Sequence, residues 1–282
     1  MAGADARKVW VRRLDVADLE ACLELAEDRS WARERAKWRL LLELGGGYGI
    51  DDPGGGLAGT VFLTVVAPGT GVVGMLLVAR RQGGHGLGRR LMEEALSAAG
   101  CTTVFLYATE AGRPLYAKLG FHVADEVTAY AGVFRRPGGH PPPVGVRAAG
   151  AGDFPTLARL DRRAFGADRS GLLRRMLTFA DRVVVTAGGF AGVWRNLDTV
   201  HAGPLVADSL STAKALLDTG LAEAEATATT RVDLHSHAAA ALGGWLAGRG
   251  LTARPPAPLM VLGHGLPGNR AMLLSPLMQA LG

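Results

Sequence analysis

The chain has 282 residues, of which 48% are hydrophobic and 20% charged, so it can form one large or two smaller folded domains and is not disordered. Its net charge of +5 fits an anionic ligand, whereas its two cysteines are too few for a disulfide framework or a zinc ribbon. The sequence has no apolar stretch of about 18 residues that would cross a membrane and no apolar signal core, so we expect a cytoplasmic protein.

The first half of the sequence alternates between strand-like and helix-like patterns. Short β-branched apolar runs predict strands, and apolar residues spaced three and four apart predict helices. We expect Ser30 to be the N-cap of the second helix. The expected elements are a strand at 9–13, helices opening at 15 and at 30–44, a loop at 45–56 with short strand character at 48–50, strands at 60–66 and 72–78, a helix opened by residues 86–88, a strand at 104–107, a short helix ending at 115–116, and one or two strands within 123–134 that close the first sheet.

A proline-rich segment separates this half from the next. Four prolines make residues 135–143 stiff and non-helical, so we place a linker there, between domains at 1–134 and 144–282. The second half repeats the order of elements, which predicts a degenerate internal duplication. Its expected elements are a strand at 144–147, helices at 153–165 and 169–179, strands at 183–186, 191–194 and 200–206, a helix from 208 or 209 to 224, a strand at 232–234, a helix at 237–249 and a strand at 257–263.

A basic, glycine-rich loop follows the predicted strand at 72–78. The loop spans Arg80 to His85, and Gly86-Leu87-Gly88 then opens a helix. Glycines let a ligand approach the backbone closely, and free N–H groups at a helix N-terminus favour an anion. The loop has neither the P-loop spacing nor the third glycine of a dinucleotide site, so these two phosphate sites are disfavoured. The sequence therefore predicts a phosphate-bearing ligand of another kind, with a ligand-free glycine turn as the alternative.

Two motifs at the expected separation resemble the GNAT superfamily of acyl-CoA N-acyltransferases. The loop motif of that family ends in Gly, any residue, then Gly or Ala, and Gly86 and Gly88 match both small positions. A Tyr four residues before Gly-Phe is the second motif, met by Tyr116 with Gly120-Phe121. The chain departs from the family at Gly83, where a Gln or Arg is usual, and at Thr109, where many members have Asn.

The resemblance implies an α/β fold of two tandem GNAT-like domains, each with a mixed, mostly antiparallel central sheet flanked by helices. It implies acetyl-CoA, or another acyl-CoA, as co-substrate. The corresponding stretch of the second half, residues 203–217, contains no Gly-x-Gly, so we expect that half to have lost its cofactor site. By resemblance, the cofactor contacts are Leu76, Leu77, Val78, Gly83, Gly84, His85, Gly86, Leu87, Gly88, Arg89 and Thr109.

Acyl transfer to an amine needs a hydrogen bond to the thioester carbonyl and a proton for the leaving thiolate. Tyr116 stands at the usual place of the general acid in the resembled family; the alternative is a tyrosine that only packs. Trp31, Asp51 and His201 are candidate acceptor contacts, with sheet packing, turn chemistry and a structural role as the respective alternatives. The general base stays open, and no third ligand joins the nearby histidines 235 and 237, so no metal is expected.

These inferences predict an N-acyltransferase that acts on a small-molecule primary amine, and a second domain that closes over the acceptor or forms a homodimer. One alternative keeps the fold but takes the acyl group from aminoacyl-tRNA. Another is a non-catalytic protein that binds acyl-CoA without turnover.

Overall fold

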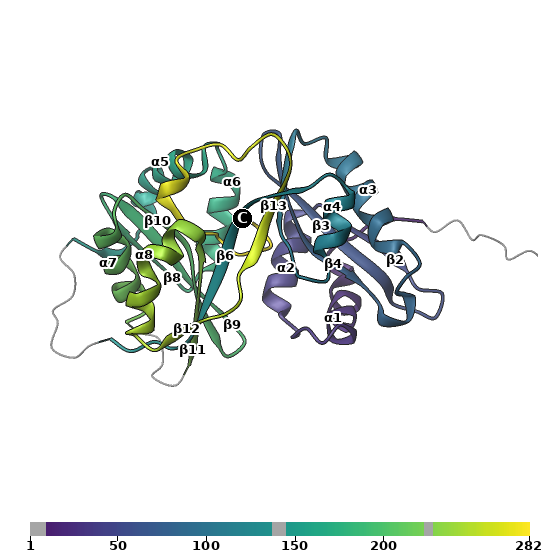
Figure 1. The fold of residues 1–282 in the computed structure, drawn as a ribbon, viewed down its shortest axis with the longest axis horizontal. Helices are drawn as coiled ribbons and strands as arrows, with labels where there is room; N and C mark the ends of the chain where they lie inside the picture. The colour runs from purple at the N-terminus through teal and green to yellow at the C-terminus, as the bar shows by residue number, and fades with distance from the viewer. Residues whose placement is uncertain (1–9, 137–144, 223–227) are drawn as a thin grey trace, which may run out of the picture. The chain divides into compact units, whose positions relative to one another are not determined.

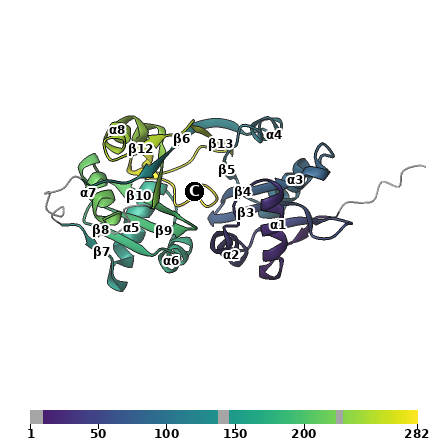
Figure 2. The same ribbon diagram turned by 90° about the horizontal axis from the view of Figure 1, so that it is seen from below.

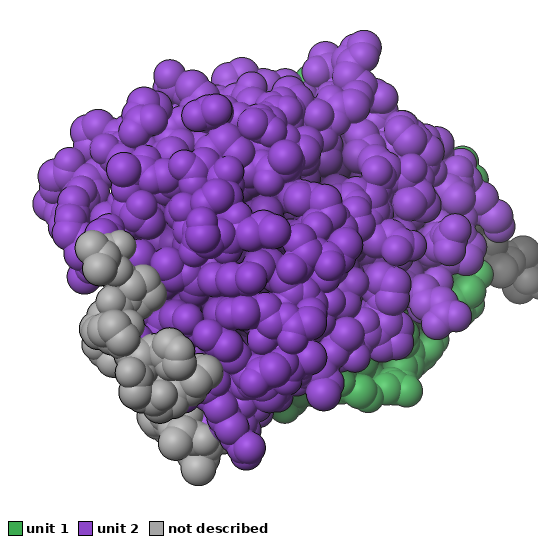
Figure 3. All heavy atoms as spheres, turned by 60° about the vertical axis from the view of Figure 1, so that its left-hand side comes forward, with its two compact units in different colours: residues 1–65, 73–100 green, residues 66–72, 101–282 purple. Residues whose placement is uncertain are grey.

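The computed structural model describes residues 10–136, 145–222 and 228–282 (Figure 1). Contacts divide the described chain into two compact units, shown in two colours in Figure 3. The first unit contains the residues up to Val65 and residues 73–100, and the second contains residues 66–72 and those from 101 onward. None of the helices in these ranges is both long and apolar enough to span a membrane.

The first unit is a small sheet in the order β1-β2-β3-β4 with three α-helices. β2 pairs antiparallel with β1 and β3, and a buried edge-on contact joins Trp38 to Phe62, whose ring centroids are 5.6 Å apart. The elements are β1 (Arg12–Arg13), η1 (Val16–Asp18), α1 (Leu19–Asp28), α2 (Arg35–Leu44), β2 (Gly47–Asp51), β3 (Leu57–Ala67), β4 (Thr70–Val78), η2 (Arg80–Gln82) and α3 (Leu87–Ala99).

The second unit contains the strands in the order β5-β13-β6-β11-β10-β9-β8-β7. Its pairings are antiparallel except for β10 with β11, which run parallel because α7 crosses between them. The elements are β5 (Thr103–Tyr107), α4 (Arg113–Lys118), β6 (His122–Val133), β7 (Arg147–Ala148), η3 (Ala151–Asp153), α5 (Phe154–Phe165), α6 (Ser170–Phe179), β8 (Arg182–Thr186), β9 (Gly189–Asn196), β10 (Thr199–Ala207), α7 (Leu210–Gly220), β11 (Thr229–His235), α8 (Ser236–Ala247), β12 (Leu251–Ala253), β13 (Ala257–Gly263), η4 (Arg270–Met272) and β14 (Leu273–Ser275).

The core of the second unit lies between this sheet and its helices (Figure 2). α7 and α8 bury Leu216 and Leu242 in one cluster with Val193 of β9. α5 contacts β9, β10 and β14. The predicted strands and helices occur in the predicted order in both halves, with β12 and β14 as additional short strands in the second, so the structure supports the inferred repeat. The boundary at 135–143 stays a prediction, because residues 137–144 lie outside the described ranges.

Strands from the two halves of the sequence are interleaved in the second unit. β13, from the end of the chain, pairs antiparallel with β5 and also with β6. The second part of β6 pairs with the whole of β11, with Val127 opposite His235 and Val133 opposite Thr229. The expectation that residues 123–134 close the first sheet is therefore wrong, because β6 pairs with β13 and β11 and not with β5. Long-range pairing places β13 between β5 and β6, and no local pattern encodes that choice.

The start of the second helix also differs from the prediction. Asp15 caps η1 as expected, accepting from the N–H of Ala17 at 2.8 Å. Ser30, however, does not cap α2, which begins at Arg35. It has a left-handed backbone (φ 60°) just after α1, and its hydroxyl accepts a hydrogen bond from Arg80. Ser30 therefore ends one helix rather than beginning the next.

Candidate functional site

The glycine-rich loop joins β4 to α3 in the first unit. Gly84 and Gly86 have left-handed backbones, with φ of 80° and 75°, and Gly86 is the N-cap of α3. A Cβ built on either glycine would meet no atom within 4 Å. Positive φ, rather than lack of space, is thus the reason for glycine at both positions. Residues 83–86 are exposed, so a ligand can reach their backbone.

The first turn of α3 supplies the donors that an anion needs. The first intrahelical bond runs from the Arg90 N–H to the Gly86 carbonyl at 3.1 Å. The N–H groups of the three preceding residues come too early in the helix for an intrahelical acceptor. No acidic residue lies in this turn, and Arg89 contributes positive charge while it pairs with Glu93 at 2.7 Å. The predicted contacts Gly86, Leu87 and Gly88 lie together here.

Two consecutive arginines anchor the entry to the loop. The Arg80 backbone N–H donates to the Asp28 carboxylate at 2.6 Å, and its guanidinium donates to the Asp28 carbonyl and to the Ser30 hydroxyl. Arg81 turns instead to Asp52, with 3.0 Å between its Nε and an oxygen of that carboxylate. The loop entry is therefore tied to the end of α1 and to the end of β2.

β4 is distorted just before the predicted cofactor contacts at its end. Met75 has φ 53°, which is rare for a residue with a side chain, and Thr60 holds it by donating to its carbonyl at 3.0 Å. The three residues that follow, Leu76–Val78, alternate between half-buried and buried side chains. No sequence signal marks Met75. Backbone strain of this kind is held in place by its surroundings and is frequent at ligand sites.

Tyr116 lies on α4 in the second unit, 8% exposed. Burial raises its pKa to about 12. Its ring packs against Phe121 and lies over Gly112, where a Cβ would come within 2.9 Å of it. Within the described ranges, no residue forms a hydrogen bond with its hydroxyl. Thr109, the other predicted contact in this unit, uses its hydroxyl to accept from the Gly112 N–H at 3.2 Å.

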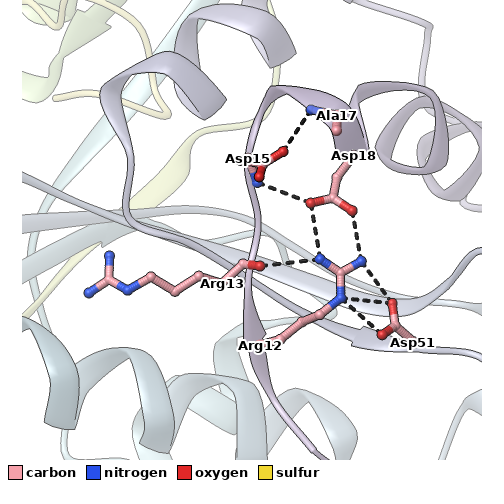
Figure 4. Close-up of polar contacts among 6 residues, drawn as sticks. All are labelled: Arg12, Arg13, Asp15, Ala17, Asp18 and Asp51. Atoms are coloured by element: carbon pink, nitrogen blue, oxygen red, sulfur yellow. Dashed lines mark hydrogen bonds and ion pairs between the residues drawn. The ribbon is translucent and has the colours of Figure 1, made fainter.

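The predicted acceptor contacts have different environments. Trp31 follows α1 and is 37% exposed. Asp51 is held by Arg12, which also binds Asp18 (Figure 4). His201, in the second unit, stacks on Trp194 with ring centroids 4.1 Å apart. The loop contacts, Trp31 and Asp51 thus lie in the first unit, whereas Thr109, Tyr116 and His201 lie in the second.

The histidines considered as metal ligands belong to a polar cluster instead. The buried His235 ring lies 3.1 Å from the Asp125 carboxylate through Nδ1, and its Nε2 faces Arg270 at 3.5 Å. Ser236 donates to the same carboxylate. In the described part of the chain, no three His, Cys, Asp or Glu side chains are grouped to hold a metal ion.

In the second half, β10 has the place that β4 has in the order of elements of the first half, and β14 pairs with part of its edge. β10 pairs with β11 from Thr199 to Ala202 only. Beyond that point its neighbour is β14, with Leu205 opposite Ser275. Gly203 allows this approach, since a Cβ there would come within 2.6 Å of the Pro276 carbonyl oxygen. The edge of β10 that pairs with β11 up to Ala202 is thus paired with β14 beyond it.

Comparison with known proteins agrees with this architecture. Two different family models, both described as an acetyltransferase (GNAT) domain, match the chain, one at residues 47–123 and the other at residues 157–275. The uncharacterized N-acetyltransferase YitH of Bacillus subtilis (strain 168) is 27% identical over 186 residues, which are 64% of this chain and 66% of that protein. The chain therefore spans slightly less than two thirds of this curated relative.

Solved structures share the fold over the whole chain. A Pyrococcus horikoshii protein described as a candidate acetyltransferase superposes with a TM-score of 0.85 and 19% identity, covering 100% of this chain and 99% of its own. A tandem GNAT protein from the clavulanic acid biosynthesis pathway gives 0.63 and 16%, covering 92% and 99%. Matches to two models of the GNAT domain, in the two halves of a repeated fold, lead to one conclusion: the chain belongs to the GNAT acetyltransferase superfamily and carries two of its domains in tandem.

Proposed function

We propose that the protein transfers an acyl group from an acyl-CoA, in the simplest case acetyl-CoA, to the primary amine of a small molecule. The exposed glycine loop up to Gly86, together with the first turn of α3, carries this proposal. Its left-handed glycines and the start of α3 offer several N–H donors to one anion, which suits the pyrophosphate of CoA. Arg89 adds positive charge beside it.

Tyr116 is proposed as the general acid. The amine nitrogen attacks the thioester carbonyl carbon, the C–S bond breaks, and the leaving sulfur takes a proton from the Tyr116 hydroxyl, while the amine proton passes to a base or to water. Burial raises the pKa of Tyr116 to about 12, so the phenol is protonated at neutral pH, as an acid must be. Asp51 and Asp52 are poor candidates for the base, since each already binds an arginine.

We assign one donor site per chain, because β14 occupies the corresponding edge of β10 in the second half. Calorimetric titration with acetyl-CoA, at two salt concentrations, should give one binding event per chain. Gly86→Glu should abolish it, because a carboxylate would face the phosphates. Gly100→Glu is the matched control: Gly100 caps the other end of α3, with φ 59° and open space around it. Absence of binding by the unmodified protein at either salt would refute the acyl-CoA assignment.

The role of Tyr116 has its own test. Tyr116→Phe should retain donor affinity and lose turnover in an amine screen, since only the hydroxyl is removed. Unchanged turnover would refute the general acid. If the unmodified protein binds acetyl-CoA but no amine is acylated, the non-catalytic alternative is favoured.

A second candidate donor is aminoacyl-tRNA, and one surface favours it. Arg159 and Arg163 on α5 and Arg174 on α6 are exposed, and the first two line a groove along α5. Binding of tRNA through such a surface would weaken steeply with salt, because phosphate contacts release counterions. Reversing the charge of Arg159 and Arg163 should then abolish binding of tRNA and leave binding of acetyl-CoA unchanged. Salt-insensitive binding of acetyl-CoA, with none of tRNA, would exclude this candidate.

A further inference from the structure

The glycine loop contributes almost nothing to its own rigidity. Three of its four residues from Gly83 to Gly86 are glycines, which have the greatest backbone freedom of any residue and no side chain to pack. At its exit the loop is fixed by α3, whose Leu87 is buried. At its entry the Gly83 N–H donates to the Arg80 carbonyl at 3.2 Å. A loop of this composition needs further anchors on its entry side to keep one conformation.

Asp52 provides such anchors. One of its carboxylate oxygens, Oδ2, accepts from Arg81 Nε and from Gln82 Nε2, both at 3.0 Å. The other oxygen accepts from the Gly54 N–H at 2.8 Å, which fixes the turn after β2. The Asp52 side chain is only 4% exposed, whereas that of Arg81 is 55% exposed. One buried carboxylate thus holds both residues that immediately precede the glycines.

The charge of Asp52 is maintained by the same contacts. The Gly54 N–H, the Gln82 amide and the Arg81 guanidinium together lower its pKa below the ordinary value of an aspartate. A charged acceptor forms stronger hydrogen bonds than a neutral one. It also fixes the orientation of Gln82, which comes one residue before Gly83, the position where the resembled family usually has Gln or Arg. Gln82 therefore has a structural partner here.

We propose that Asp52 is a positioning residue for donor binding, which acts through Arg81 and Gln82 to hold the glycine loop in the conformation that presents its N–H groups. The proposal rests on the assignment of acyl-CoA to this loop. If the loop samples other conformations when Asp52 is neutralised, the apparent Kd rises in inverse proportion to the fraction of the loop that stays competent. A competent fraction reduced to about one tenth raises the Kd about tenfold.

Asp52→Asn tests the proposal, since it keeps the shape of the side chain and removes the charge. Asp18→Asn is the matched control: Asp18 also binds one arginine, Arg12, and one backbone N–H, that of Asp15, but neither partner belongs to the loop. The Kd of CoA should rise about tenfold in Asp52→Asn and stay unchanged in Asp18→Asn. Gln82→Met, which preserves size, should give part of the same loss.

Binding of pantetheine, which has no phosphate, distinguishes a change in the position of the glycine loop from general damage to the folded protein. The affinity for pantetheine should be the same in Asp52→Asn as in the unmodified protein, because pantetheine does not use the loop amides. An unchanged Kd of CoA in Asp52→Asn would overturn the inference and leave the donor assignment intact. An equal loss for CoA and pantetheine would also overturn it, since the damage would not be confined to the loop. If the unmodified protein fails to bind CoA, the donor assignment itself fails, and this inference with it.

Discussion

Three glycines around α3 allow the effect of backbone strain to be separated from ligand contact. Gly86 and Gly100 cap the two ends of the helix, with φ of 75° and 59°, and a Cβ added to either would meet no atom within 4 Å. Alanine at either position therefore suffers only from the left-handed backbone, which costs roughly 1–2 kcal/mol. Gly83 lies in the same loop but has φ −62° and ψ 145°, an extended conformation that alanine readily adopts.

We therefore expect Gly86→Ala and Gly100→Ala to lower the melting temperature by similar amounts, about 2–4 °C for each kcal/mol in a protein of this size. Only Gly86→Ala should also weaken binding of acetyl-CoA. If the substituted loop leaves the left-handed conformation when free, it must return to that conformation to bind the donor. The cost of roughly 1–2 kcal/mol then raises the Kd roughly 5- to 30-fold. Gly83→Ala should change the Kd by less than about threefold, because its Cβ meets only the Arg80 carbonyl oxygen, at 3.3 Å.

Thermal melts and calorimetry on the three variants decide the question. Equal Kd values for Gly86→Ala and Gly100→Ala would refute the reasoning, since the loop conformation would then have no bearing on the donor. A Kd raised as much by Gly83→Ala as by Gly86→Ala would refute it in another way. Any side chain in the loop would then block the ligand, and positive φ would not be the cause.

Three further predictions concern the second unit. Asp161→Ala should lower the free energy of unfolding by about 3–5 kcal/mol in a urea titration, because it leaves the buried Arg169 guanidinium without its carboxylate; a loss below about 1 kcal/mol would contradict this. Burial lowers the pKa of His235, so stability should hold above the unfolded-state pKa of about 6.5 and fall as the pH drops below it, and His235→Gln should flatten that dependence between pH 8 and 5. Gly203→Ala should lower the melting temperature by displacing β14, yet calorimetry should still find one CoA per chain, because residues 203–217 contain no Gly-x-Gly loop; a second bound CoA would show that β14 alone keeps the donor out of the second half.

Local patterns predicted most elements of the fold. The strand β13 carries a continuous apolar run, and the prediction at 257–263 agrees with it at both ends. The amphipathic helix α5 follows the same logic, beginning one residue later than predicted and ending at Phe165. Each of these elements buries one face of a helix or the length of one strand. Its apolar residues therefore follow a regular pattern within a short stretch of sequence.

The partners of strands could not be predicted in the same way. β12 and β14 are three residues long and carry no periodic signal. They form because β6 and β10 offer unpaired edges, which is a property of the folded unit rather than of the segment. Ser30 failed as a predicted N-cap for a similar reason. Its hydroxyl accepts a hydrogen bond from Arg80, fifty residues away in the sequence. A serine suits both this role and the capping of a helix, so the local sequence does not distinguish them.

The site was predictable at the positions where the backbone conformation requires glycine. Left-handed φ at Gly84 and Gly86 agrees with a loop that needs glycine for its backbone. The supporting residues were not predictable. Asp52 stands in an Asp-Asp-Pro-Gly run that indicates only a turn, and it does cap one, yet it also holds Gln82 from thirty residues away. The strained Met75 has no signal at all, because its conformation is imposed by neighbours such as Thr60.

The interleaved strands lead to a last prediction, on the independence of the two halves. If the chain is divided within the predicted linker, the first piece contains β5 and β6 but lacks β13, the strand that pairs with both. Each would then expose unpaired backbone along one edge, which favours aggregation. The second piece would lack β6, the partner of β11. We therefore expect each piece to aggregate when expressed alone and the two to co-purify as a folded pair when expressed together, as judged by size exclusion and circular dichroism. A monomeric first piece with a cooperative melt would show that the pairing of β13 is dispensable, and that the halves fold as the independent domains inferred from the linker.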